Sequence, residues 1–305
     1  MYKLEGKVFR EFGNLELLAK QVVEGFIIGR HKSPFHGFSA EFAEHRIYNP
    51  GESTKFIDWK VYARTEKMFT KKYEEETNLR CQLVVDASSS MAFPYQSESI
   101  NKLQYAALGA ASIMYLLQKQ RDAFGLSLFD EDLIVNTLCK SNTSHFKMLM
   151  SQLENKIHQH NLLQKTNTSK ILHQIAELIH KRSLVVIFSD MFSSNENPND
   201  LFSSLQHLKY NKHEVLLFHV VDQKSEISFE FENRPYLFVD LETGEEVKLQ
   251  SSRLKEEYAQ KMADYMKGLK DKCLQFGIDF IEADLSSGFG SVLQNYLVKR
   301  NKMSR

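Results

Sequence analysis

The sequence predicts an α/β fold, with a doubly wound, mostly parallel sheet of about six strands and helices on both faces. The prediction rests first on short apolar runs at residues 80–85, 184–188 and 214–221, which have the pattern of strands buried on both faces. It rests also on the segments between these runs, where apolar residues recur at helical spacing. Buried strands that alternate with helices indicate βαβ crossovers, because parallel strands need a long connection.

The other elements can be assigned in chain order. A short amphipathic helix is predicted at residues 15–26, before a long polar stretch at 29–52 that has no sustained period. Further strands are expected at 123–129, 133–138 and 278–282, with two short strands around the Glu-Thr-Gly-Glu turn within 236–249. The remaining helices are predicted at 100–118, 145–157, 169–180, 199–208, 253–276 and 291–299. This order divides the chain into an N-terminal helix-loop extension, residues 1–78, and a sheet domain, residues 79–305, with a small strand insertion near 223–250.

The charge balance and the termini restrict the class of protein. The 305 residues carry 39 Lys+Arg and 39 Asp+Glu, whereas a general nucleic-acid or membrane-surface binder would carry a basic excess. The three cysteines are far apart and form no CxxC pair, which indicates free thiols in a reducing compartment. The N-terminus lacks the apolar core of a signal peptide, and the best candidate for a membrane span, residues 106–117, is shorter than the roughly 20 residues required. We therefore expect a cytoplasmic protein with no membrane insertion and no nucleic-acid partner.

Polar side chains gather where the predicted strands end. Asp86-Ala87-Ser88-Ser89-Ser90 reads Asp-x-Ser-x-Ser directly after one buried run, Asp190 follows another, and a Thr-rich loop precedes a predicted helix. Ligands of an open parallel sheet bind outside the carboxyl ends of its strands. Carboxylate and hydroxyl oxygens suit Mg²⁺, Mn²⁺ or Ca²⁺. The structural alternative is that these residues only cap helices and form turns.

This arrangement resembles the metal-ion-dependent adhesion site (MIDAS) of von Willebrand factor A domains. That family has Asp-x-Ser-x-Ser after the first strand, a Thr in a later loop and an Asp after the fourth strand. The resemblance implies the metal ligands Asp86, Ser88, Ser90, Thr166 and Asp190. Thr166 is preferred to Thr168 because it leaves room for the helix to begin.

A longer signature lies nearer the N-terminus. It consists of Glu41-Phe42, Arg46-x-Tyr48, Pro50-Gly51-Glu52, Ile57-Asp58-Trp59-Lys60 and Ala63-Arg64. This set resembles the bacterial family called domain of unknown function 58, in which Asp usually stands at the position of Glu52 and Arg at that of Lys55. The family also usually has Gly-Gly-Thr where this chain has Gln164-Lys165-Thr166. The resemblance continues at residues 73–76, 86–91, 181–190 and 296–300, and so extends over nearly the whole chain.

The charged cluster of this signature has two interpretations. In the first, Trp59 is an anchor that fixes the segment on the sheet domain, with Asp58 paired to Arg46 or Arg64. Alternatively, the cluster is a partner-docking surface of charged residues around one aromatic anchor. Its residues are Arg46, Tyr48, Asp58, Trp59, Lys60 and Arg64.

The resemblance implies a non-enzymatic, metal-dependent protein–protein interaction module. Members of the family tend to be encoded beside MoxR-type AAA+ ATPases, and such pairs are thought to act as chaperones in the maturation or assembly of client proteins. The chain would then be an adaptor between ATPase and client, with a carboxylate of a partner completing the coordination of the metal. The sequence contains no Gly-x-Ser-x-Gly, P-loop or Gly-x-Gly-x-x-Gly motif.

Two alternatives remain at this stage. The first is a metal-dependent phosphate-ester hydrolase at the same cation, with Glu98 or Asp130 as general base. The second is a sheet domain whose metal site is vestigial, with docking performed by the segment from Arg46 to Arg64.

Overall fold

The structure is a computed structural model that describes residues 14–27, 45–48, 57, 59–71, 79–95, 99–159, 167–192, 197–241 and 244–303. The chain forms two compact units. The first contains residues 1–34 and 80–305, and the second contains residues 35–79. The predicted boundary at residue 78 lies close to the end of the second unit, whereas helix α2 (Leu15–Ile27), placed by prediction in the N-terminal extension, belongs to the unit with the sheet.

The first unit is built on a six-stranded sheet in the order β10-β7-β6-β3-β4-β5. The strands are β3 (Arg80–Asp86), β4 (Ala123–Phe129), β5 (Leu133–Asn136), β6 (Leu184–Ser189), β7 (Glu214–Val221) and β10 (Asp279–Asp284). All neighbours pair in parallel except β5, which is antiparallel to β4 at one edge. The predicted fold class is therefore confirmed.

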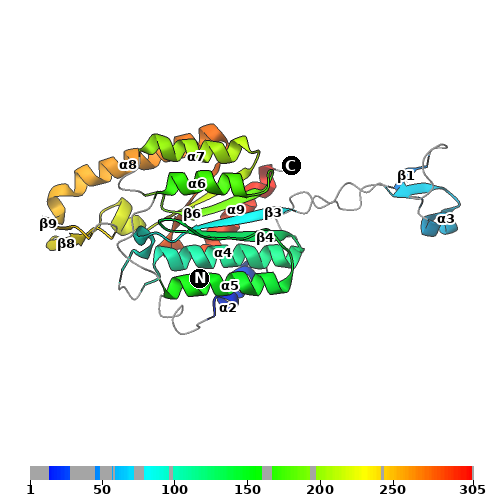
Figure 1. Ribbon diagram of the computed structural model, residues 1–305, viewed down its shortest axis with the longest axis horizontal. Coiled ribbons are helices and arrows are strands. Elements are labelled where there is room, and N and C mark those ends of the chain that lie inside the picture. The colour runs from blue at the N-terminus through cyan, green and yellow to red at the C-terminus, as the bar shows by residue number, and fades with distance from the viewer. Residues whose placement is uncertain are drawn as a thin grey trace. The chain divides into compact units, whose positions relative to one another are not determined.

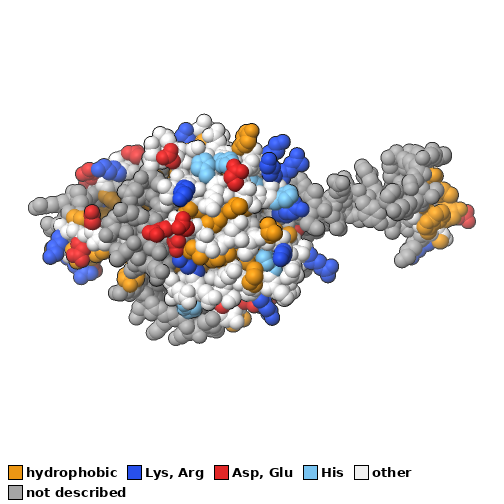
Figure 2. Space-filling model, viewed as in Figure 1, with side chains coloured by type: hydrophobic (Ala, Val, Ile, Leu, Met, Phe, Trp, Pro, Cys, Tyr) orange, Lys and Arg blue, Asp and Glu red, His pale blue; other side chains and the backbone are white. Residues whose placement is uncertain are grey.

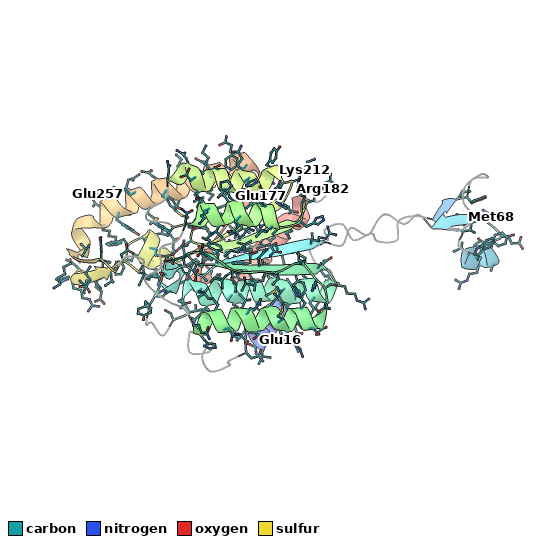
Figure 3. The ribbon with its side chains drawn as sticks, viewed as in Figure 1. Glu16, Met68, Glu177, Arg182, Lys212 and Glu257 are labelled. Atoms are coloured by element: carbon teal, nitrogen blue, oxygen red, sulfur yellow. The ribbon has the colours of Figure 1, made fainter. Side chains whose placement is uncertain are left out.

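Helices cover both faces of this sheet (Figure 1). One face carries α2, α4 (Lys102–Gln120), α5 (Thr143–His158) and α9 (Phe289–Met303), which contact one another. The other carries α6 (Thr168–Leu178), α7 (Pro198–Tyr210) and α8 (Ser251–Phe276), which share a buried apolar cluster with β3, β6 and β7. Glu177 on α6 and Glu257 on α8 have exposed side chains (Figure 3). Of the described helices, none is long and apolar enough to cross a bilayer.

An insertion follows β7. It contains a π-helical turn (Gln223–Ile227) and an antiparallel hairpin of β8 (Pro235–Val239) and β9 (Glu246–Gln250). Phe229 ties the insertion together, because its ring lies 4.6 Å from that of Tyr258 on α8 and 5.5 Å from that of Phe238 on β8. The turn and the hairpin therefore share one aromatic cluster with the start of α8.

The second unit, described by itself, has a short antiparallel pair of strands, β1 (His45–Ile47) and β2 (Phe69–Lys71), and the helix α3 (Trp59–Thr65). Ile57 is buried in it. Its described surface is rich in hydrophobic side chains (Figure 2), with Ile47, Trp59 and Met68 all exposed.

Gly109 lets α4 approach the core closely. Phe188 and Phe218 stack with their ring centroids 4.9 Å apart, and Phe289 of α9 contacts both rings. A Cβ atom on Gly109 would lie 2.6 Å from Phe188 Cε1 and 2.8 Å from Phe289 Cε2. A side chain at position 109 therefore has no room unless the stacked rings move.

We expect Gly109→Ala to lower the free energy of unfolding. Overpacking a core costs about 1–3 kcal/mol, which exceeds the gain of ~1 kcal/mol from a better helix former. Gly268→Ala on α8 is the matched control, because its Cβ would meet nothing within 4 Å. That variant should be stabilised by up to ~1 kcal/mol. Urea unfolding of both variants measures the difference, and equal effects of the two substitutions would contradict the packing argument.

Candidate metal site

The two predicted carboxylates meet where the strand order of the sheet reverses. Asp86 is the last residue of β3, and Asp190 directly follows β6. These strands are neighbours, with Val85 opposite Phe188. From β3 the chain continues to β4 on one side of the pair, and from β6 it continues to β7 on the other side. Such a switch point is where open α/β sheets bind ligands. Both side chains are buried, with exposed fractions of 0% and 1%.

Asp86 is held by the loop that follows it and by the adjacent strand. The backbone N–H of Ser88 donates to its Oδ1 at 2.9 Å, and the hydroxyl of Ser189 donates to its Oδ2 at 2.6 Å. Ser88 and Ser90 have their hydroxyl oxygens 3.1 Å apart, as the chain enters a 3₁₀ turn (Ser89–Ala92). The Asp-x-Ser-x-Ser loop therefore brings its two serine hydroxyls together beside a fixed carboxylate.

Asp190 is held from three sides. The backbone N–H of Phe192 donates to its Oδ1 at 3.1 Å, and the ammonium of Lys102 donates to its Oδ2 at 2.7 Å. His219 on β7 lies with Nε2 2.8 Å from the carbonyl oxygen of Asp190. Lys102, the first residue of α4, is 1% exposed and also donates to Glu226 Oε1 at 2.6 Å. The structure thus adds the buried ammonium of Lys102 and the carboxylate of Glu226 to the predicted site.

The threonine position remains open. Thr166 lies outside the described residues. Thr168 begins α6 after the N-cap Asn167 and is 1% exposed, and its hydroxyl has no hydrogen-bond partner among the described residues. Helix α6 leads directly to the start of β6, so its last residues lie near the amino end of that strand. Its first residue therefore lies toward the carboxyl end of β6, at the same edge of the sheet as Asp190. Thr168 therefore has the burial and the free oxygen expected of a ligand, although Thr166 is the residue that the sequence favours.

The charges of the site influence one another. Burial and the negative charge of Asp190 raise the pKa of Asp86 from 3.8 to about 7. Burial lowers the pKa of Lys102, but the charges of Asp190 and Glu226 outweigh burial and raise it overall. Burial lowers the pKa of His219 to about 4, so its imidazole is neutral and Nε2 donates to Asp190. With Asp86 ionised, the site contains three carboxylates and one ammonium, and the ammonium contacts two of them.

These groups fit a hard divalent cation. The part of the chain that the structure describes contains no group of three or more His, Cys, Asp or Glu side chains able to hold a metal, and the other oxygen donors beside the two aspartates are hydroxyls. Ser88, Ser90 and Thr168 offer them, and the hydroxyl of Thr168 is buried with no partner there. The surplus of two negative charges matches the charge of the ion. Oxygen donors of this kind are those preferred by Mg²⁺, Mn²⁺ and Ca²⁺.

Comparison with protein families matches residues 44–267 to the family described as "Protein of unknown function DUF58". The chain belongs to the DUF58 family. Curated relatives include the uncharacterized proteins Mb1516 of Mycobacterium bovis and Rv1480 of Mycobacterium tuberculosis. Each is 34% identical over 102 residues, which is 33% of this chain and 32% of the relative. The matched segment is thus about a third of the length of these relatives.

The solved structures that match the chain are more distant in sequence. The conserved hypothetical protein BatB from Bacteroides thetaiotaomicron has 14% identity and a TM-score of 0.45, covering 73% of this chain and 99% of its own. An aerotolerance-related membrane protein from Bacteroides fragilis has 15% identity and a TM-score of 0.40, covering 72% of this chain and 99% of its own.

The DUF58 match includes the predicted docking segment, of which the structure describes a part. The backbone of Arg46 pairs with Thr70 in the two-stranded sheet, and the N–H of Tyr48 donates to the carbonyl of Met68 at 2.9 Å. Trp59 is 57% exposed, with its ring 6.1 Å from that of Tyr62. Arg64 is exposed at the end of α3. Asp58 and the side chains of Arg46 and Lys60 lie outside the described residues, so the proposed ion pairs of Asp58 stay predictions.

The two candidate bases of the hydrolase alternative have different outcomes. Asp130, next after β4, has its Oδ2 2.8 Å from the ammonium of Lys156, and its Oδ1 accepts from the N–H of Asp132. Glu98 lies outside the described residues. The carboxylate of Asp130 is thus engaged in an ion pair, which does not favour a role as a base.

The raised pKa of Asp86 gives a signed dependence of stability on pH. Between 3.8 and about 7 the folded chain holds a proton that the unfolded chain has lost, so the contribution of this group to stability falls as pH rises. Asp86→Asn removes the titration. With a chelator present, we expect the free energy of unfolding of the wild type minus that of the variant to decrease across this range. Urea unfolding at constant ionic strength tests this, and a constant difference would show that the pKa is not raised.

Proposed function

We propose that this DUF58 protein is a non-enzymatic interaction module that binds partners through a divalent cation, Mg²⁺ or Mn²⁺, at the β3–β6 edge of its sheet. The observation that carries the proposal is the meeting of Asp86 and Asp190 at the switch point, beside the paired hydroxyls of Ser88 and Ser90. The family resemblance supports the same location for a MIDAS-type site.

The residues divide the work in a simple way. Asp86 and Asp190 supply negative charge, and the hydroxyls of Ser88, Ser90 and a threonine, Thr168 or Thr166, supply neutral oxygens. Ser189 and the N–H of Ser88 fix the orientation of the Asp86 carboxylate. When bound, the cation provides a coordination position for a carboxylate from a partner. The two charged ligands leave the ion close to neutral, so a carboxylate of an external Asp or Glu can still coordinate it.

We propose further that the chain is an adaptor that works with a MoxR-type AAA+ ATPase in the cytoplasm, during the maturation or assembly of client proteins. The support for this partner is the family resemblance. The second unit offers a separate surface for it, where the exposed ring of Trp59 lies next to Tyr62 and Arg64 is exposed on the same helix. Aromatic and arginine side chains are the ones that most often dominate the binding energy of interfaces.

Calorimetric titration with Mg²⁺ and Mn²⁺ tests the cation. We expect binding by the wild type and none by Asp86→Ala, because that variant loses a charged ligand. Asp130→Ala is the matched control, since Asp130 also follows a strand directly but is paired with Lys156. It should bind as the wild type does. Equal binding by Asp86→Ala would place the cation elsewhere in the chain.

Two binding assays separate the two surfaces. Capture of clients should be lost with a chelator and with Asp86→Ala, because both remove the coordination position. Binding of a purified MoxR-type ATPase should instead be lost with Trp59→Ala and with the Arg64→Glu charge reversal, while cation binding persists. If client capture survives both chelator and Asp86→Ala, the metal-dependent mode of binding is wrong. The docking segment would then be the interaction surface.

A further inference from the structure

The candidate cation site already contains a positive charge. The ammonium of Lys102 lies 2.7 Å from Asp190 Oδ2 and 2.6 Å from Glu226 Oε1. Lys102 and Asp190 are each 1% exposed, whereas Glu226 is 19% exposed. A buried lysine is costly unless it is paired, and here two carboxylates pair with it. The charge of Lys102 therefore belongs to the electrostatics of the site.

The ammonium of Lys102 donates to the carboxylate oxygen of Asp190 that does not accept from the backbone. Oδ1 of Asp190 accepts from the N–H of Phe192, and Oδ2 accepts from Lys102. A divalent cation drawn to this carboxylate meets a like charge already in contact with it. Removing a positive charge this close to a carboxylate changes cation binding there by about 10- to 1,000-fold, as for its proton affinity.

Glu226 is the second carboxylate acceptor of the Lys102 ammonium. Its Oε2 accepts from the N–H of Asp222 at 2.9 Å, which fixes the carboxylate on the turn after β7. The backbone of Lys102 is also fixed, because its N–H donates to the carbonyl of Phe93 at 2.9 Å and Asn101 caps α4 through a reciprocal capping box. The flexible part of the arrangement is the four-carbon stem of Lys102, anchored at one end between two rigid acceptors.

We propose that Lys102 is the resident counter-ion of the cation site and sets its affinity. Without a divalent cation the ammonium neutralises Asp190, and with one bound it stays with Glu226. The site is thus tuned to bind weakly until a partner's carboxylate adds its own attraction. This inference rests on the proposed function, because it assigns a role to Lys102 at the same site.

Mn²⁺ binding, followed by the loss of its free electron paramagnetic resonance signal, tests the role of Lys102. Lys102→Met keeps an unbranched side chain only one atom shorter and removes the charge, so we expect it to bind Mn²⁺ about tenfold more tightly or better. Lys102→Arg keeps the charge and should not tighten binding. The matched control is Lys156→Met, which removes another paired lysine, that of Asp130, and should bind as the wild type does.

Glu226→Gln gives a prediction of opposite sign. It leaves Asp190 as the charged acceptor of Lys102 among the three residues of this network, so Mn²⁺ binding should weaken. In the Lys102→Met background the same change should have a smaller effect, because there is no ammonium for Glu226 to pair with. The double-mutant cycle measures this coupling. Circular dichroism of each variant confirms that it is folded. If Lys102→Met does not fold, Glu226→Gln alone tests the inference: weaker Mn²⁺ binding supports it, and equal or tighter binding contradicts it.

The outcomes separate this inference from the proposed function. If the wild type binds Mn²⁺ and folded Lys102→Met binds equally or more weakly, Lys102 is not the counter-ion, and the proposed function stands. Binding by Lys102→Met alone would support the inference in its strongest form. If neither protein binds Mn²⁺, both ideas fail, and the lysine is a permanent part of a metal-free site. Effects of Glu226→Gln that are equal in both backgrounds would also overturn the role given to Lys102.

Discussion

The parallel pairing of β3 with β6 is the constraint on which the rest of the site depends. Five consecutive pairs, from Cys81 opposite Leu184 to Val85 opposite Phe188, fix the register of two strands that are about a hundred residues apart in the chain. A shift by one residue would exchange the faces of every side chain. It would also separate Ser189 from the carboxylate of Asp86. The apolar core thus determines where the charged groups stand.

Most of the fold could be predicted from the sequence because its strands are nearly pure apolar runs and its helices have a clear period. The same pattern placed Asp86 and Asp190 at strand ends, and the sheet order then brought them together. Lys102 and Glu226 were missed for a physical reason. They lie 88 and 36 residues from Asp190, and each occupies a position that reads as an ordinary solvated charge in its own segment.

Other parts of the site could not be predicted from the local pattern of residues along the chain. Ser189 ends an apolar strand, and its role as a donor to Asp86 depends on the neighbouring strand. The choice between Thr166 and Thr168 depends on where α6 begins, and helix boundaries are the least predictable feature of a sequence. The structure starts the helix at Thr168, with Asn167 as its cap. Asparagine is a strong N-cap residue, and this signal was available in the sequence.

The hairpin that follows the Glu226 turn has a consequence for how such proteins diverge. Tyr236 and Phe238 face the aromatic cluster, so the alternation of a strand places Leu237 and Val239 on the opposite side, where they are 47% and 48% exposed. Substitutions on that outer side leave the aromatic cluster and the strand-end carboxylates untouched. The outer side of this hairpin can therefore change in sequence without altering the groups that stand at the sheet edge.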